Sequence, residues 1–108
     1  MKDLTKLTKL EMKKLPALYG TEKVGLKNKV IQVHFFLGGC DWYGVEFDGE
    51  DLFWGYCILN NDFHNAEWGY FSLQELASIR KPFMVEKDRY WTVRKASEVE
   101  KINRGMNW

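Results

Sequence analysis

Three stretches of the chain have the hydrophobic pattern of β-strands: Val30–Leu37, Trp42–Phe47 and Leu52–Leu59. Each is rich in Val, Ile, Phe, Tyr and Trp, the residue types that are enriched in strands. The sequence Asp48-Gly49 lies between the second and the third, and Asp-Gly is a strong signal for a tight hairpin turn. The pattern therefore predicts antiparallel pairing of consecutive strands.

Later segments add a fourth strand and a short helix. Glu67–Phe71 is predicted to be the strand, and Ser72 and Glu75 have the spacing of a capping box that begins a helix running to about Ile79. Pro82 ends this region, because proline cannot continue a helix.

The C-terminal part is predicted from weaker patterns. Phe83–Glu86 and Tyr90–Val93 are expected to form a last hairpin, and Ala96–Ile102 a helical turn. Residues 104–108 are expected to be a loose tail.

Residues 1–19 have the periodicity of a basic amphipathic helix. Its leucines and its lysines fall on opposite sides: Leu4, Leu7, Leu15 and Leu18 against Lys2, Lys6, Lys9 and Lys13. Thr8 and Glu11 have capping-box spacing, which would place the start near Thr8, and Pro16 would interrupt the helix. Such a helix either covers the core or binds an anionic membrane or a partner groove.

Strand register follows from the assumed turn lengths. A four-residue turn over 48–51 pairs Tyr43 with Tyr56 and Gly44 with Gly55, and it also pairs Val45 with Trp54 and Phe47 with Leu52. For the first hairpin, a loop of odd length over 38–42 puts the apolar residues of both strands on one face. We expect Gly38 or Gly39 to supply a positive φ there.

This register predicts one buried face and one open face of the sheet. The open face would carry a shallow groove whose floor is formed by Gly44 and Gly55, because paired glycines let a ligand approach the backbone. Its walls would be four side chains: His34, Glu46, Phe53 and Cys57. A helix lying over the same glycines is the structural alternative.

Together these elements predict an α+β fold in a single domain, residues 1–108, with 45% hydrophobic residues to form its core. Its antiparallel sheet would have four to six strands, with the helical segment first and the short helix after strand four. Residues 30–93 would hold the sheet and the short helix. No signal peptide and no run of about 18 apolar residues occurs, so we expect a cytoplasmic protein of a bacterial cell that does not contact a membrane.

Charge is distributed unevenly along the chain. Residues 1–29 carry a net charge of +5, residues 80–108 carry +4, and residues 30–79 carry −8 without any Lys or Arg. A nucleic-acid-binding protein usually has a dominant basic surface, so nucleic acid is not an expected partner. The candidate binding residues are acidic and aromatic and lie in predicted loops: Asp41, Trp42, Asp48, Glu50 and Asp51. They would suit a basic protein surface; alternatively, these acids simply collect at turns.

Catalytic and metal-binding motifs are not found in the sequence. Cys40 and Cys57 have no CxxC or histidine-cluster spacing, so we expect free thiols, no metal and no cofactor. Asp62-Phe63-His64 is too short a motif to indicate a metal site. We therefore expect a protein that is not an enzyme; a hydrolase using His64 or Cys57 is a third alternative, and nucleic-acid binding is the least favoured.

Several motifs occur in the order and spacing of a known family. They are Leu15-Pro16-Ala17-Leu18-Tyr19, Trp42-Tyr43 with Glu46-x-Asp48, Gly55-Tyr56, Gly69-Tyr70-Phe71-Ser72-Leu73-x-Glu75-Leu76, and Val85-Glu86-Lys87-Asp88. Over roughly residues 15–95 the chain resembles the small bacterial family called domain of unknown function 2958. The resemblance implies a place on plasmids, integrative elements or phage, often near antirestriction genes, and it implies context rather than mechanism.

Two functions follow as hypotheses. The first is a non-enzymatic accessory protein of a mobile genetic element that binds a host protein with a basic surface, for example as a counter-defence inhibitor of the anti-CRISPR or antirestriction type. The alternative is a protein that binds or sequesters a small ligand, such as a nucleotide signal, in the groove over Gly44 and Gly55.

Overall fold

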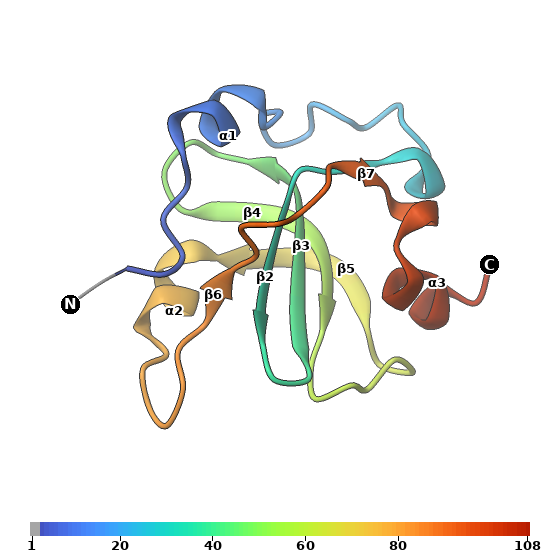
Figure 1. Cartoon of the computed structure of the whole chain (residues 1–108). Helices are drawn as coiled ribbons and strands as arrows, with labels where there is room; N and C mark the ends of the chain where they lie inside the picture. The colour runs from blue at the N-terminus through green and yellow to red at the C-terminus, as the bar shows by residue number, and fades with distance from the viewer. Residues whose placement is uncertain (1–2) are drawn as a thin grey trace.

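A five-stranded antiparallel sheet forms the centre of the computed structural model, which describes residues 3–108 (Figure 1). The strand order is β5-β4-β3-β2-β6. The strands are β2 (Val33–Leu37), β3 (Cys40–Phe47), β4 (Leu52–Ile58), β5 (Glu67–Ser72) and β6 (Glu86–Lys87). A separate two-stranded sheet pairs β1 (Val30–Ile31) with β7 (Arg94–Lys95). The predicted α+β class is confirmed, and so are the antiparallel sheet, the N-terminal helix and the short helix after the fourth predicted strand.

Short helices lie around the edges of the sheet (Figure 1). They are α1 (Lys9–Lys14), α2 (Leu73–Ser78) and α3 (Glu100–Met106), with 3-10 turns η1 (Leu26–Asn28) and η2 (Ala96–Glu98). Thr8 is the N-cap of α1 and forms the predicted capping box with Glu11. The Ser72 hydroxyl caps α2 by accepting a hydrogen bond from the backbone N–H of Glu75. Within the described part of residues 1–19, however, only Lys9–Lys14 is α-helical, and Leu7 and Leu15 pack on the core from outside that helix.

The first hairpin has an even loop, which corrects the predicted odd one. Leu37 pairs with Cys40, so the loop contains only Gly38 and Gly39. Gly38 has the expected positive φ, 55°. Two-residue hairpin loops need positive φ because their twist must match the twist of the strands.

A β-bulge at Val45 corrects the register of the second hairpin. Tyr43 pairs with Tyr56 and Gly44 with Gly55, as predicted, but the next pairs are Glu46 with Trp54 and Phe47 with Phe53. Val45 is therefore the extra residue of β3. A bulge reverses the alternation of side chains beyond it, so Phe47 faces the opposite side from the one that the unbroken register predicts.

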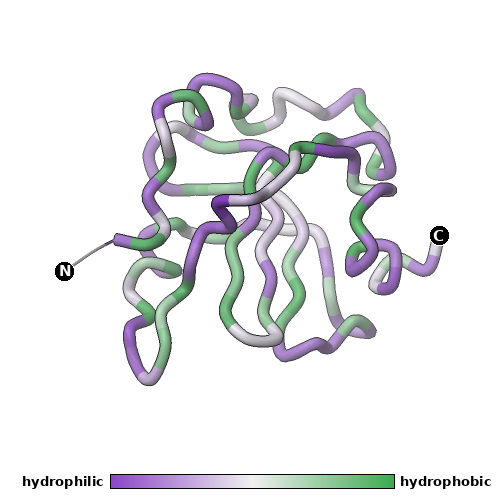
Figure 2. Tube along the Cα trace, in the orientation of Figure 1, coloured by the Kyte–Doolittle hydropathy of each residue, from purple (hydrophilic) through white to green (hydrophobic). Residues whose placement is uncertain are grey.

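The sheet consequently buries both faces, and the prediction of one open face is wrong. One core contains Val33, Phe35, Trp42, Phe47, Phe53 and Phe71, with Leu76 from α2. The other contains Ile31, Tyr43, Val45, Tyr56 and Ile58, with Val99 and Ile102 from the C-terminal segment. In Figure 2 hydrophobic segments recur along the central strands between paler ones, as expected for strands that are packed on both sides.

The C-terminal segment is more ordered than the sequence predicts. No hairpin joins 83–86 to 90–93: β6 pairs with β2, and β7 pairs with β1. Residues 104–108 are not a loose tail, because Arg104–Met106 belong to α3 and Trp108 Nε1 donates a hydrogen bond to Asn103 Oδ1 at 2.6 Å. Trp68 Nε1 also lies 3.3 Å from Met106 Sδ, which ties α3 to β5.

Across residues 3–108, every helix is too short or too polar to cross a lipid bilayer.

Candidate functional site

The five acidic and aromatic binding candidates do not form one surface. Asp41 and Trp42 lie within β3 rather than in a loop, and both are buried, with 3% and 8% of their surface exposed. Trp42 belongs to one of the two cores. Neither residue is therefore available to anchor a partner.

The other three candidates gather at the turn between β3 and β4. Asp48 Oδ1 accepts hydrogen bonds from the backbone N–H groups of Glu50, Asp51 and Leu52. These bonds hold the pKa of Asp48 below its usual value, since they stabilise the ionised carboxylate. Asp51 accepts hydrogen bonds from the Ser72 hydroxyl and from the backbone N–H of Gln74. The turn is thereby fixed against the start of α2.

Glu75 supplies a fourth carboxylate near this turn, because it follows Gln74 in the first turn of α2 and its N–H donates to Ser72, and both Gln74 and Ser72 contact Asp51. We call Asp48, Glu50, Asp51 and Glu75 the acidic corner. All the ion pairs that the structure describes within residues 3–108 are made by other carboxylates. The acidic corner therefore keeps its negative charge toward solvent, whereas Asp41 is neutralised.

The predicted groove does not exist, because the bulge and the even hairpin distribute its walls over two faces. Phe53 is fully buried in the core that also contains Phe47, whereas His34 and Glu46 lie on the opposite side with Tyr43 and Trp54. The glycine floor is occupied as well. A Cβ on Gly44 would come within 2.8 Å of Val33 Cγ2, and one on Gly55 would overlap the backbone oxygen of Tyr43.

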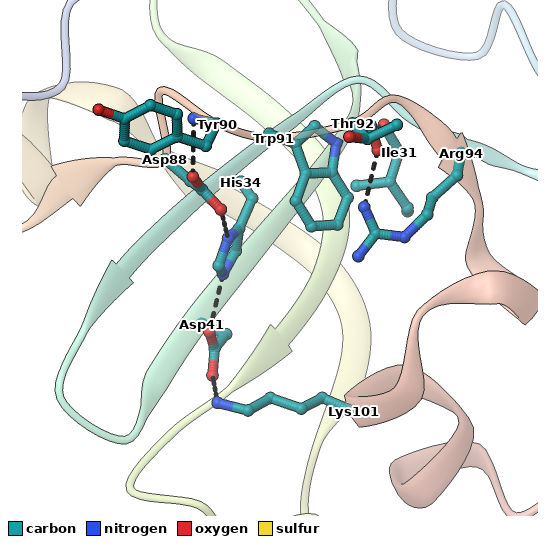
Figure 3. Close-up of polar contacts among 9 residues, drawn as sticks. All are labelled: Ile31, His34, Asp41, Asp88, Tyr90, Trp91, Thr92, Arg94 and Lys101. Carbon is teal, nitrogen blue, oxygen red and sulfur yellow. Dashed lines mark hydrogen bonds and ion pairs between the residues drawn. The ribbon is translucent and has the colours of Figure 1, made fainter.

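His34 instead belongs to a chain of polar contacts around the buried Asp41 (Figure 3). Its Nε2 lies 2.7 Å from Asp41 Oδ1, and its Nδ1 lies 3.1 Å from Asp88 Oδ2. Lys101 Nζ, from α3, donates to the other oxygen of Asp41 at 2.9 Å. Both ring nitrogens face carboxylates, and both can donate only when the ring carries two protons and a positive charge.

These contacts stabilise the ionised form of Asp41 and hold its neighbours in place. Burial by itself raises the pKa of Asp41, but the hydrogen bonds from His34 and Lys101 outweigh it, and the net pKa is lowered. The imidazole stacks on Tyr43, with ring centroids 4.6 Å apart. Each ring nitrogen faces a carboxylate, so His34 ties β2 to β3 and to the segment after β6, and Asp41 extends these contacts to α3.

Glu46 organises a different site on the same side of the sheet. Its Oε1 accepts a hydrogen bond from the backbone N–H of Tyr19 at 2.8 Å. Its Oε2 accepts hydrogen bonds from the backbone N–H and from the hydroxyl of Thr21. Although Glu46 lies in a strand, only 5% of its surface is exposed, and its carboxylate fixes the loop that follows Pro16.

Lys29 lies beside this carboxylate and is also 5% exposed. Its Nζ donates to the backbone oxygen of Thr21 at 2.7 Å and to the Thr21 hydroxyl at 3.0 Å. The same ammonium lies 5.1 Å from the centre of the Trp54 ring, a cation–π contact. The Thr21 hydroxyl thus connects a buried cation to a buried anion.

A pocket of about 540 Å³ opens above these groups. We call it the tyrosine pocket; it is lined by Tyr19, Leu26, Lys29, Glu46, Trp54 and Tyr70, and also by Glu22, Val24 and Gly25. Tyr19 is 64% exposed and Tyr70 is 50% exposed, and their hydroxyls lie 3.3 Å apart. Pockets that combine apolar walls with a few convergent polar groups are the usual form of small-molecule sites.

Sequence reasoning identified Glu46 but none of its partners. A carboxylate in an apolar strand is a visible anomaly, and it was the only local signal. Tyr19, Thr21 and Lys29 lie in or next to a polar connection that has no motif, and 25 to 27 residues separate the first two from Glu46. Asp88, a partner of His34, and Lys101, a partner of Asp41, also lie far away in the sequence and carry no local signal.

The remaining reactive side chains are placed apart. Burial, together with the nearby Glu67, raises the pKa of the Cys57 thiol to about 12. His64 is exposed in the loop before β5. Among residues 3–108, no three His, Cys, Asp or Glu side chains are grouped so that they could hold a metal ion.

A larger hollow of about 820 Å³ lies beside Phe36, Leu37 and the loop with Pro82 and Phe83. Its charged residues, Arg80, Lys81 and Glu86, are all exposed, so it contains no buried charged group that would orient a ligand. The tyrosine pocket and the acidic corner are therefore the better candidate sites.

When the chain is compared with curated proteins and with solved structures, neither set contains a match. A family model described as "Protein of unknown function (DUF2958)" matches residues 6–101, and because this match spans most of the chain, the protein belongs to that family.

Proposed function

We propose that this protein is a non-enzymatic accessory protein of a mobile genetic element that binds a host protein through a basic surface of that partner. Counter-defence inhibition is the form of this activity that we favour, and the bacterial cytoplasm is where we place it. The association of the family with plasmids, integrative elements and phage, implied by the sequence resemblance, supplies the biological context.

The acidic corner is the observation that carries the proposal. Glu50 and Glu75 are exposed on a turn and a helix start that are fixed by the hydrogen bonds of Asp48 and Asp51. A fixed cluster of like charges attracts a complementary surface without first having to be ordered. The surface is smaller than the sequence implied, because Asp41 and Trp42 are excluded from it.

The two exposed carboxylates Glu50 and Glu75 allow a clean test. Neither side chain accepts a hydrogen bond among the contacts described for residues 3–108, whereas Asp48 and Asp51 maintain the turn. Charge reversal at Glu50 and Glu75 therefore changes the charge of the corner and leaves the capping bonds in place. Glu67→Lys, at an exposed acid on β5, is the matched control.

The experiment is a pull-down from host lysate, followed by titration of the captured protein. We expect one dominant partner, and we expect Glu50→Lys/Glu75→Lys to raise its Kd by at least about tenfold at physiological salt. Glu67→Lys should leave the Kd unchanged. If the double variant binds as tightly as the wild type, the acidic corner is not the interface.

A further inference from the structure

We propose that the tyrosine pocket binds the base of a free nucleoside or nucleotide, that is, a neutral planar heterocycle with a hydrogen-bond donor beside an acceptor. This site is separate from the acidic corner, and the proposal goes beyond protein binding. It is argued from the hydrogen-bonding capacity left on two buried groups and from the rings around them.

The floor of the pocket offers one donor and one acceptor. An ammonium has three N–H groups, and Lys29 uses two of them on Thr21. A carboxylate has about four acceptor positions, and Glu46 uses three of them, with only one on Oε1. Thr21 Oγ1 contacts both groups, so Lys29 Nζ and Glu46 Oε2 lie within two hydrogen bonds of each other, and the free acceptor position is on the other oxygen of the same carboxylate.

The charge of the floor favours a neutral ligand. Lys29 and Glu46 carry opposite charges and are bridged by the Thr21 hydroxyl, so the floor itself is balanced, and the exposed Glu22 adds one negative charge to the rest of the lining. A phosphate group would meet the Glu46 carboxylate, and an organic cation would meet the Lys29 ammonium. An uncharged edge that donates to Glu46 and accepts from Lys29 satisfies both groups.

The aromatic side chains that line the pocket favour a ligand with a planar ring. The Trp54 ring already has two partners: Trp68 stacks on it at 5.3 Å, and the Lys29 ammonium lies 5.1 Å from its centre. Stacking of a ligand therefore falls to Tyr19 and Tyr70, whose rings are largely exposed. Base–aromatic stacking tolerates different bases, because every base presents a π-face.

The first test is calorimetric titration of the full chain with adenosine, guanosine, cytidine and uridine. We expect at least one to bind, and we expect its analogue with a methylated donor, such as 3-methyluridine for uridine, to bind at least about tenfold more weakly. If none of the four binds at millimolar concentration, or if the methylated analogue binds as well, the proposal is overturned.

Variants at the rim keep the test independent of folding. Tyr70→Ala removes an exposed ring of the pocket and should weaken binding at least about fivefold. Tyr90→Ala is the matched control, since Tyr90 is 93% exposed and lies outside this pocket. Equal affinity of the Tyr70→Ala and Tyr90→Ala variants would refute a role for the tyrosine wall.

The third arm separates a free base from a base within a strand. Uridine, uridine monophosphate and a uridine oligonucleotide are compared at two salt concentrations. Similar affinities for the nucleoside and the monophosphate support a pocket for one free base. Binding of the oligonucleotide alone, with a steep loss of affinity in salt, would overturn the proposal in favour of contacts with a phosphate backbone.

Discussion

Glu46 Oε1 accepts a 2.8 Å hydrogen bond from the backbone N–H of Tyr19, which has a left-handed conformation with φ of 67°. The side chain of a central strand thereby holds a loop residue in a conformation that residues other than glycine rarely adopt. The same bond brings the Tyr19 ring to the rim of the tyrosine pocket. The shape of that pocket therefore depends on a contact between a buried carboxylate and a residue with positive φ.

This geometry predicts the effect of glycine at position 19. Tyr19→Gly and Tyr19→Ala both remove the exposed ring, but only glycine adopts the left-handed conformation without steric cost. We expect Tyr19→Gly to be more stable than Tyr19→Ala by about 1 kcal/mol in urea unfolding. Equal stability of the two variants would contradict strain at this position.

We predict that the folded protein loses stability in acid when Asp41 is protonated. Its pKa is lowered in the folded state, so the stability that it contributes is complete above its unfolded pKa, near 3.8, and is lost as pH falls through the lower folded value. Asp41→Asn should cost about 3 kcal/mol at neutral pH, because it leaves His34 and Lys101 without their shared carboxylate. The difference in unfolding free energy between wild type and variant should shrink as the pH falls below the unfolded pKa of Asp41. A difference that stays constant below that pH would exclude Asp41 as the titrating group.

We predict that replacing Tyr56 by phenylalanine stabilises the folded protein. Its ring is fully buried, and its hydroxyl makes no hydrogen bond within the described part of the chain, which is an uncompensated cost. Tyr56→Phe should raise the unfolding free energy by about 1 kcal/mol, whereas Tyr70→Phe, at an exposed hydroxyl, should not.

Gly105 lies against the Tyr56 hydroxyl, and a second variant tests this contact. A Cβ at Gly105 in α3 would overlap the Tyr56 hydroxyl, so Gly105→Ala should destabilise the wild type more than it destabilises Tyr56→Phe. Additive effects in a double-mutant cycle would show that the two positions do not touch.

The two cysteines should differ in reactivity. With a pKa of about 12, Cys57 has a thiolate fraction at pH 8 that is about a thousandfold below that of an ordinary thiol. Treatment of the folded protein with iodoacetamide should therefore leave Cys57 unmodified while Cys40 reacts, and both should react in urea. Rapid alkylation of Cys57 in the folded protein, detected by peptide mass spectrometry, would contradict its burial.

The sequence by itself determined the features that depend on neighbours in the chain. Three such features are the capping box of Thr8 and Glu11, the N-cap at Ser72 and the positive φ of Gly38. The first two join residues that are three positions apart, and the third depends only on the conformational freedom of glycine. The strand segments follow from side-chain type for the same reason.

Only the tertiary structure decided which side chains share a face. The bulge at Val45 and the two-residue loop at Gly38–Gly39 each change the alternation of side chains, and nothing in the local pattern reveals a shift of one residue. The contacts of Glu46 with Tyr19 and of Asp41 with Lys101 join residues far apart in the chain. Such contacts form because the folded core brings them together, and therefore both the loss of the predicted groove and the presence of the tyrosine pocket are properties of the packed molecule.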